Sequence, residues 1–132
     1  MKKHILHTLI AIAFISNSCT DYTNPKIISG TIWRCSSFTD AEMAQTYEYV
    51  ELHFISETQV QMWEKKKNDY LYQASGTLKF TISGKTITIT IPALPQDFTT
   101  TGPNTQQDIT AVIENNKLTM PFTDYTLVFF KQ

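Results

Sequence analysis

The sequence has little of what most catalytic sites require. It holds three histidines, and two of them, His4 and His7, lie in a leader-like N-terminal segment, so that His53 stands alone in the rest of the chain. Two cysteines and four glycines complete a sparse set. One histidine and a thiol do not supply the three or four ligands of a zinc site, and neither a phosphate-binding glycine loop nor a nucleophile elbow is present. We therefore expect that the protein is not an enzyme and that it has no catalytic residues, no metal site and no cofactor.

Long hydrophobic runs are also missing. The longest mostly apolar run, residues 5–15, is shorter than the roughly 20 residues that cross a bilayer as a helix. Lys2 and Lys3 precede the run and small polar residues follow it, which is typical of a secretory signal peptide over residues 1–18. We therefore interpret this segment as an export signal.

Basic charge is scarce once this signal is removed. The remaining chain has nine basic and twelve acidic side chains, a formal charge of −3, which gives it no electrostatic reason to bind nucleic acid. Its one basic cluster, Lys65–Lys67, is followed directly by Asn68 and Asp69. This order favours a solvated hairpin turn over a site for anionic surfaces.

The residue that follows the signal is Cys19, preceded by Ser18. In this arrangement the segment resembles a bacterial lipoprotein signal, although Ser16 stands where that family usually has leucine. The resemblance implies acylation of Cys19, anchorage in the membrane through this lipid, and a cell-envelope location at the outer membrane, with residues 19–26 as a tether. The alternative is a plain secreted protein in which Cys19 pairs with Cys35. Without that pairing, we expect Cys35 to be a small buried hydrophobe.

The composition favours strands, because threonine, isoleucine, phenylalanine and tyrosine are plentiful. The first strand is expected from Ile27 to about Ser36, followed by a short helix over Asp40–Gln45 that Thr39 and Glu42 would cap. Alternating apolar positions predict further strands at 49–54, 60–62, 78–82, 87–91, 109–113, 118–120 and 125–131. Tight turns are expected at Ser83–Gly84 and Asn115–Asn116. The connection Pro92–Gln107 shows no periodicity and is left without an assigned structure.

About eight short strands in sequence order predict an all-β domain over residues 27–132. Closure into an antiparallel up-and-down barrel removes the open edges of the sheet, and eight strands are enough for closure. A two-sheet sandwich is the alternative, because periodicity does not separate the two.

Four stretches carry a family resemblance: residues 30–35 (GTIWRC), 76–91, 113–120 (IENNKLTM) and 127–132 (LVFFKQ). Together with the signal, they resemble the small lipocalin-like lipoproteins of Bacteroidota. The resemblance implies a lipocalin-like barrel in which Trp33 plugs the closed end and Lys131 lies above its ring. Lipocalins have a Gly-x-Trp motif, and this chain has one residue more between Gly30 and Trp33.

Two functions follow from these patterns. The barrel interior would bind a small hydrophobic ligand through inward-facing side chains, of which we single out Phe54, Met62, Phe80, Ile89 and Phe129. Glu48 and Glu64 are inward by parity and would hold a cationic or hydroxylated group, unless they sit at strand ends in water. In the alternative, a packed barrel presents its outer surface to a protein or glycan or acts as an envelope inhibitor. The aromatic side chains that motivate this alternative are Tyr47, Tyr49, Trp63, Tyr70 and Tyr72.

Overall fold

The computed structural model describes residues 20–93 and 105–132, which form one β-rich body. The predicted signal peptide and Cys19 lie outside the described residues, as does most of the connection Pro92–Gln107. The helices are α2 (Pro25–Ile28) and α3 (Ala41–Thr46), and the strands are β1 (Ile32–Cys35), β2 (Tyr47–Phe54), β3 (Gln59–Lys66), β4 (Leu71–Gln73), β5 (Leu78–Ser83), β6 (Thr86–Ile91), β7 (Gln107–Glu114), β8 (Lys117–Pro121) and β9 (Thr126–Lys131). Neither helix has the length and apolarity that a membrane-spanning helix requires.

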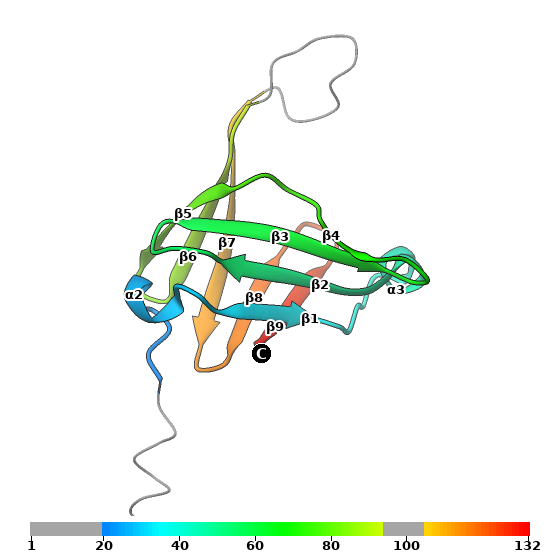
Figure 1. Cartoon of the computed structure of the whole chain (residues 1–132), viewed down its shortest axis with the longest axis horizontal. Coiled ribbons are helices and arrows are strands. Elements are labelled where there is room, and N and C mark those ends of the chain that lie inside the picture. The colour runs from blue at the N-terminus through cyan, green and yellow to red at the C-terminus, as the bar shows by residue number, and fades with distance from the viewer. Residues whose placement is uncertain (1–19, 94–104) are drawn as a thin grey trace, which may run out of the picture.

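Eight strands close into an antiparallel barrel in sequential up-and-down order, which Figure 1 shows from the side. Neighbours in sequence pair from β1 to β3 and from β5 to β9, β3 pairs with β5, and β9 returns to β1. The short strand β4, absent from the sequence prediction, pairs with the end of β3 and lies outside this closed circuit. The predicted barrel is confirmed, and its topology is consistent with a lipocalin-like fold. The sandwich is excluded.

The apolar positions of successive strands meet in one core. Its buried side chains come from every barrel strand and from the N-terminal segment: Tyr22, Ile28, Trp33, Cys35, Val50, Leu52, Phe54, Val60, Phe80, Ile87, Ile89, Ala111, Ile113, Leu118, Met120, Leu127 and Phe129. The alternation follows from strand geometry, since successive side chains point to opposite faces. Threonines of β5 and β6 occupy the alternate, more exposed positions of that hairpin.

The turns fit the sequence prediction with one shift. Ser83 pairs with Thr86 across the β5–β6 hairpin, so the two turn residues are Gly84 and Lys85 rather than Ser83 and Gly84. Gly84 takes the positive φ of +58° that this turn requires. Asn115 has a φ of 54° in the β7–β8 turn, as its side chain allows.

The N-terminal segment departs from the prediction. Asn24 caps α2 and Pro25 occupies its first turn, so Ile27 belongs to a helix and β1 begins only at Ile32. Ile28 is fully buried, and Tyr22 joins the core. Residues 20–26, which we expected to be a plain tether, therefore include a side chain that packs against the barrel. We call this end, where α2 and the β7–β8 turn lie, the closed end.

The opposite end, which we call the open end, carries α3 (Figure 1). This helix follows the predicted position within one residue, but its cap is Asp40, whose carboxylate accepts a hydrogen bond from the Met43 amide at 2.9 Å. Thr39 was therefore the wrong cap. A carboxylate at the N-cap satisfies an amide that the helix leaves without a partner.

Candidate functional site

A cavity of about 590 Å³ opens at the open end of the barrel. Its walls come from α3, from strands β2, β3, β6, β7 and β9, and from the turn between β8 and β9. The lining residues are Asp40, Glu42, Met43, Thr46, Tyr47, Val50, Met62, Glu64, Ile91, Ile109, Phe122, Asp124, Tyr125 and Leu127. We call this space the mouth cavity. Its size lies within the range of about 300–1,000 Å³ that is typical of small-molecule sites.

A second cavity of about 110 Å³ lies inside the barrel wall, and only apolar surface lines it. We call it the inner cavity. It shares Met62, Ile91 and Ile109 with the mouth cavity, and its other lining residues are Leu52, Val60, Ser75, Leu78, Ile89 and Met120. The two cavities are therefore adjacent, with the apolar one toward the barrel centre.

The inner cavity exists because β3 and β5 diverge. They pair only at Gln59–Lys79 and Val60–Leu78, and beyond that point β3 pairs with β4 instead. The Met62 amide donates to the side-chain hydroxyl of Ser75 at 2.9 Å, and the Met62 carbonyl accepts from Ala74 at 2.9 Å. The loop before β5 thus satisfies backbone groups that a neighbouring strand would otherwise pair.

The five residues predicted to contact a ligand fall into two groups. Met62 lines both cavities and Ile89 lines the inner one. Phe54, Phe80 and Phe129 do not line either cavity, and each is at most 3% exposed. Phe54 and Phe80 pack edge to face with ring centroids 5.0 Å apart. These three are core residues in the closed half of the barrel.

Sequence reasoning placed Ile91 and Ile109 on the inward face but did not single them out as ligand contacts. Both line the two cavities. Alternation identifies the face of a strand and carries no information about depth along the barrel axis. Their position near the strand ends at the open end was the one available signal.

Glu64 carries the polar chemistry of the mouth cavity. The hydroxyl of Tyr72 donates a hydrogen bond to its Oε2 at 2.6 Å. This bond, with smaller contributions from burial and from the Glu64 charge, raises the pKa of Tyr72 to about 12. Burial, followed by the nearby Glu64 charge, raises the pKa of Tyr47. Glu64 and the two phenols therefore form a polar group on the inward side of the mouth.

Glu48 does not share this position. Its carboxylate pairs with Lys65 Nζ at 2.8 Å, and its side chain is 55% exposed. The register of β2 against β3 shifts between Tyr47 and Tyr49, and this irregularity breaks the alternation at Glu48. The inward prediction was thus wrong for Glu48, while Glu64 does line the mouth cavity.

Trp33 fills the closed end. It is fully buried, its indole N–H donates to the Thr31 hydroxyl at 2.8 Å, and Tyr22 packs edge to face on it with centroids 5.2 Å apart. Lys131 is the direct cross-strand neighbour of Trp33, but its ammonium lies 5.9 Å from the ring centroid of Tyr22. The ammonium of Lys131 therefore lies over the ring of Tyr22, a residue that the sequence prediction did not include.

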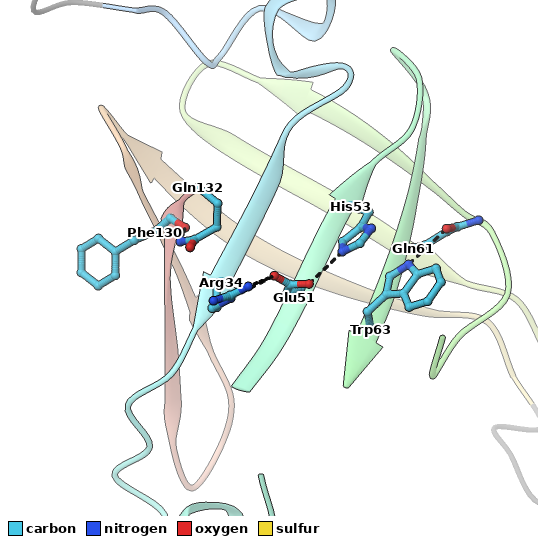
Figure 2. A network of polar contacts seen from close by, with 7 residues as sticks. All are labelled: Arg34, Glu51, His53, Gln61, Trp63, Phe130 and Gln132. Carbon is cyan, nitrogen blue, oxygen red and sulfur yellow. Dashed lines mark hydrogen bonds and ion pairs between the residues drawn. The ribbon is translucent and has the colours of Figure 1, made fainter. Parts of the chain in front are cut away.

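The outer wall over β1, β2 and β3 carries a polar network (Figure 2). Glu51 is 3% exposed, and its two carboxylate oxygens meet Arg34 at 2.9 Å and His53 at 3.1 Å. His53 stacks on Trp63 with centroids 5.0 Å apart, and the Trp63 indole donates to Gln61 at 3.2 Å. Buried charge is stable when it is paired in this way. The network joins neighbouring strands across the wall and lies on the face opposite to the cavities.

Cys35 faces the interior and is fully buried. Burial raises the pKa of its thiol, which lowers the fraction of reactive thiolate. The predicted small buried hydrophobe is confirmed. Among the described residues, no three histidine, cysteine or acidic side chains are grouped as a metal ion would require.

The aromatic side chains expected on the surface do not form one patch. Tyr47 lines the mouth cavity, and Tyr72 bonds to Glu64 beside it. Arg34 covers the ring of Tyr49 at 4.0 Å, and Trp63 is stacked with His53. Tyr70 is 84% exposed. Most of this set therefore packs against neighbouring side chains.

Replacement of Trp33 by alanine is expected to lower the free energy of unfolding by about 3–5 kcal/mol, because a large buried side chain leaves a void. Trp63→Ala removes the other tryptophan from the outer wall and is expected to cost about 1 kcal/mol, the scale of one aromatic pair. Urea denaturation followed by circular dichroism measures both. Equal losses in the two variants would contradict the role of Trp33 as the plug of the closed end.

The bond between Tyr72 and Glu64 predicts a pH dependence at the alkaline end. The pKa of Tyr72 is raised from 10 to about 12 in the folded protein, so its contribution to stability is complete below about pH 10 and is lost as the pH rises toward 12. A tyrosinate absorbance titration should show a last step near pH 12 that Tyr72→Phe removes and Glu64→Gln moves to lower pH. Glu114→Gln, at the closed end, should leave that step in place. A last step that survives in Tyr72→Phe would refute the assignment.

Comparison with known proteins identifies no relative of this chain. No family model matches the chain, and neither the curated proteins nor the solved structures contain a significant match. The chain is a small, closed, eight-stranded antiparallel barrel. The mouth cavity lies at its open end, and a further hollow of about 410 Å³ lies at the other end, beside residues 20–23 and the β7–β8 turn.

Proposed function

We propose that the protein is a lipid-anchored lipoprotein of the cell envelope whose non-enzymatic, lipocalin-like barrel binds a small hydrophobic ligand at its open end. The observation that carries this proposal is the mouth cavity of about 590 Å³ that adjoins an apolar inner cavity of about 110 Å³. Apolar cavities inside proteins stay dry and take up apolar molecules. An apolar segment of a ligand would fill the inner cavity while the rest of the ligand occupies the mouth.

The arrangement of the two ends supports the anchor. Lipid on Cys19 would be separated from buried Tyr22 by only Thr20 and Asp21, and an extended residue spans at most about 3.6 Å. The closed end would therefore lie against the membrane, and the mouth cavity would face away from it. Placement at the outer membrane is supported by the resemblance to Bacteroidota lipoproteins alone.

The position of His53 supports a binding role over a catalytic one. His53 is engaged by Glu51 and Trp63 on the outer wall, whereas the cavities lie inside. The mouth cavity is lined by carboxylates, phenols and apolar groups. Binding requires shape and apolar contact, and these are what the open end provides.

The variant Ile109→Trp tests the ligand site. Ile109 lines both cavities, so Ile109→Trp should fill them and abolish binding. Native mass spectrometry of the protein purified from its own host should show a co-purifying small molecule in the wild type, and none in this variant. Val112→Trp is the matched control, because Val112 lies on the same strand and is 42% exposed on the outside.

Two negative results together would contradict the proposed ligand site. If the wild-type protein carries no small molecule and does not bind the dye ANS, the barrel is packed in solution. The alternative of an outer surface that recognises a protein or glycan, or inhibits an envelope enzyme, would then be favoured.

Cys19→Ala tests the anchor. The wild-type protein is expected in the membrane fraction of its host, because acylation adds about 0.8 kcal/mol of membrane affinity for each buried methylene group. The variant should move to the soluble fraction, as followed by immunoblot. An unchanged distribution would exclude the lipid anchor and leave the ligand site untouched.

A further inference from the structure

We propose that the ligand of the mouth cavity is a cationic amphiphile, with its apolar chain in the inner cavity and its positively charged head among the carboxylates and aromatic rings of the mouth. This inference rests on the proposed function, since it names the class of ligand for the same site. Three features of the two cavities point to it: their order along the barrel, the sign of the charge at the mouth, and the aromatic rings beside that charge.

The order of the cavities defines a polarity. The inner cavity presents only apolar surface, and Met62, Ile91 and Ile109 continue that surface into the mouth. Apart from Ser75, whose hydroxyl accepts a hydrogen bond from the Met62 amide, the polar side chains lie farther out, on α3, on β3 and in the β8–β9 turn. A molecule that matches both regions has an apolar chain and a polar head, because burial of either part against the wrong surface costs free energy.

The charged residues that line the mouth cavity are all acidic. Four carboxylates line the mouth cavity, those of Asp40, Glu42, Glu64 and Asp124, and none of the described lining residues is basic. One base borders the rim: the ammonium of Lys66 lies 5.7 Å from the ring centroid of Tyr72, and its charge acts on the Tyr47 hydroxyl. The four lining carboxylates outnumber it. Four carboxylates spread around one opening favour a cation and disfavour an anionic head such as a fatty acid carboxylate.

Aromatic rings stand beside these carboxylates. Tyr47, Phe122 and Tyr125 line the mouth cavity, and the rings of Phe122 and Tyr125 stack with centroids 4.9 Å apart. The face of an aromatic ring attracts a cation, and sites that combine such faces with acidic groups recognise quaternary ammonium ions. Glu64 has one oxygen engaged by Tyr72, and Asp40 caps α3 through one oxygen. These hydrogen bonds do not neutralise the two carboxylates. A quaternary ammonium ion, which donates no hydrogen bond, would still be attracted by their charge.

The test compares three probes that share a decyl chain and differ in the head: decyltrimethylammonium, decyl maltoside and decyl sulfate. Each is titrated calorimetrically, below its micellar concentration, into the chain from Thr20 onward, which contains every strand of the closed barrel. We expect the cationic probe to bind at least about fivefold more tightly than the neutral probe, which corresponds to one ion pair in high dielectric. The anionic probe should bind most weakly, and added salt should narrow the differences.

Single substitutions assign the preference to the mouth. Glu64→Gln and Asp124→Asn should each weaken binding of the cationic probe about fivefold and leave binding of the neutral probe unchanged. Glu114→Gln removes a carboxylate at the closed end and should change neither affinity. Circular dichroism of each variant controls for folding.

The outcomes separate this inference from the proposed function. If all three probes bind equally, or if the sulfate binds most tightly, the cationic class is wrong while the hydrophobic site stands. If no probe binds, the proposed ligand site itself fails. If the cationic preference persists in both mouth variants, it arises elsewhere on the molecule, and the inference is overturned.

Discussion

The antiparallel pairing of β1 with β9 joins the first barrel strand to the last, and both cavities depend on it. This seam is short, with registered pairs at Trp33–Lys131 and Arg34–Phe130. Fully buried Trp33 lies on its inner side, and the Gln132 amide donates to the Ile32 carbonyl at 2.9 Å beyond the registered pairs. A sheet without this closure would expose two edges and would have no interior. The β1–β9 pairing therefore closes the meander of strands into a barrel with an interior.

The two ends of the barrel differ in strand pairing and in side-chain packing. At the closed end, Tyr22, Ile28 and Trp33 belong to the buried core, and the hollow at this end is lined mainly by polar residues of the N-terminal segment and the turns. At the other end, β3 turns away from β5 toward β4, and side chains no longer meet across the barrel. The mouth and inner cavities are the consequence of this divergence. One end is suited to packing and the other to binding.

The aromatic and charged side chains of the wall have mostly structural partners. Arg34 lies between Glu51 and Tyr49, and His53 between Glu51 and Trp63. These contacts cross strand boundaries and link neighbouring strands. A separate set of charged groups, the carboxylates at the mouth, faces the cavity. The sequence alone does not separate the two sets, because Glu51 and Glu64 both alternate with other residues along strands, and the positions of α3 and the β8–β9 turn over the mouth are set by the fold.

Much of the fold was predictable from local patterns. The β5–β6 and β7–β8 hairpins, the turn after Lys67 and the buried state of Cys35 followed from alternation, turn chemistry and residue type. The errors also have local causes that only the structure reveals. Pro25 after an N-capping asparagine began a helix where a strand was expected. The irregular register of β2 moved Glu48 outward.

The sequence by itself determined which faces of the strands are apolar and where the chain turns, because both depend on residues close together in the chain. Tertiary structure decided which inward residues line a cavity and which form the core. Phe54 and Met62 lie on the same inward face of neighbouring strands, yet one is packed against Phe80 and the other lines both cavities. The difference is depth along the barrel, which is set by long-range strand pairing and cannot be read from a period of two residues.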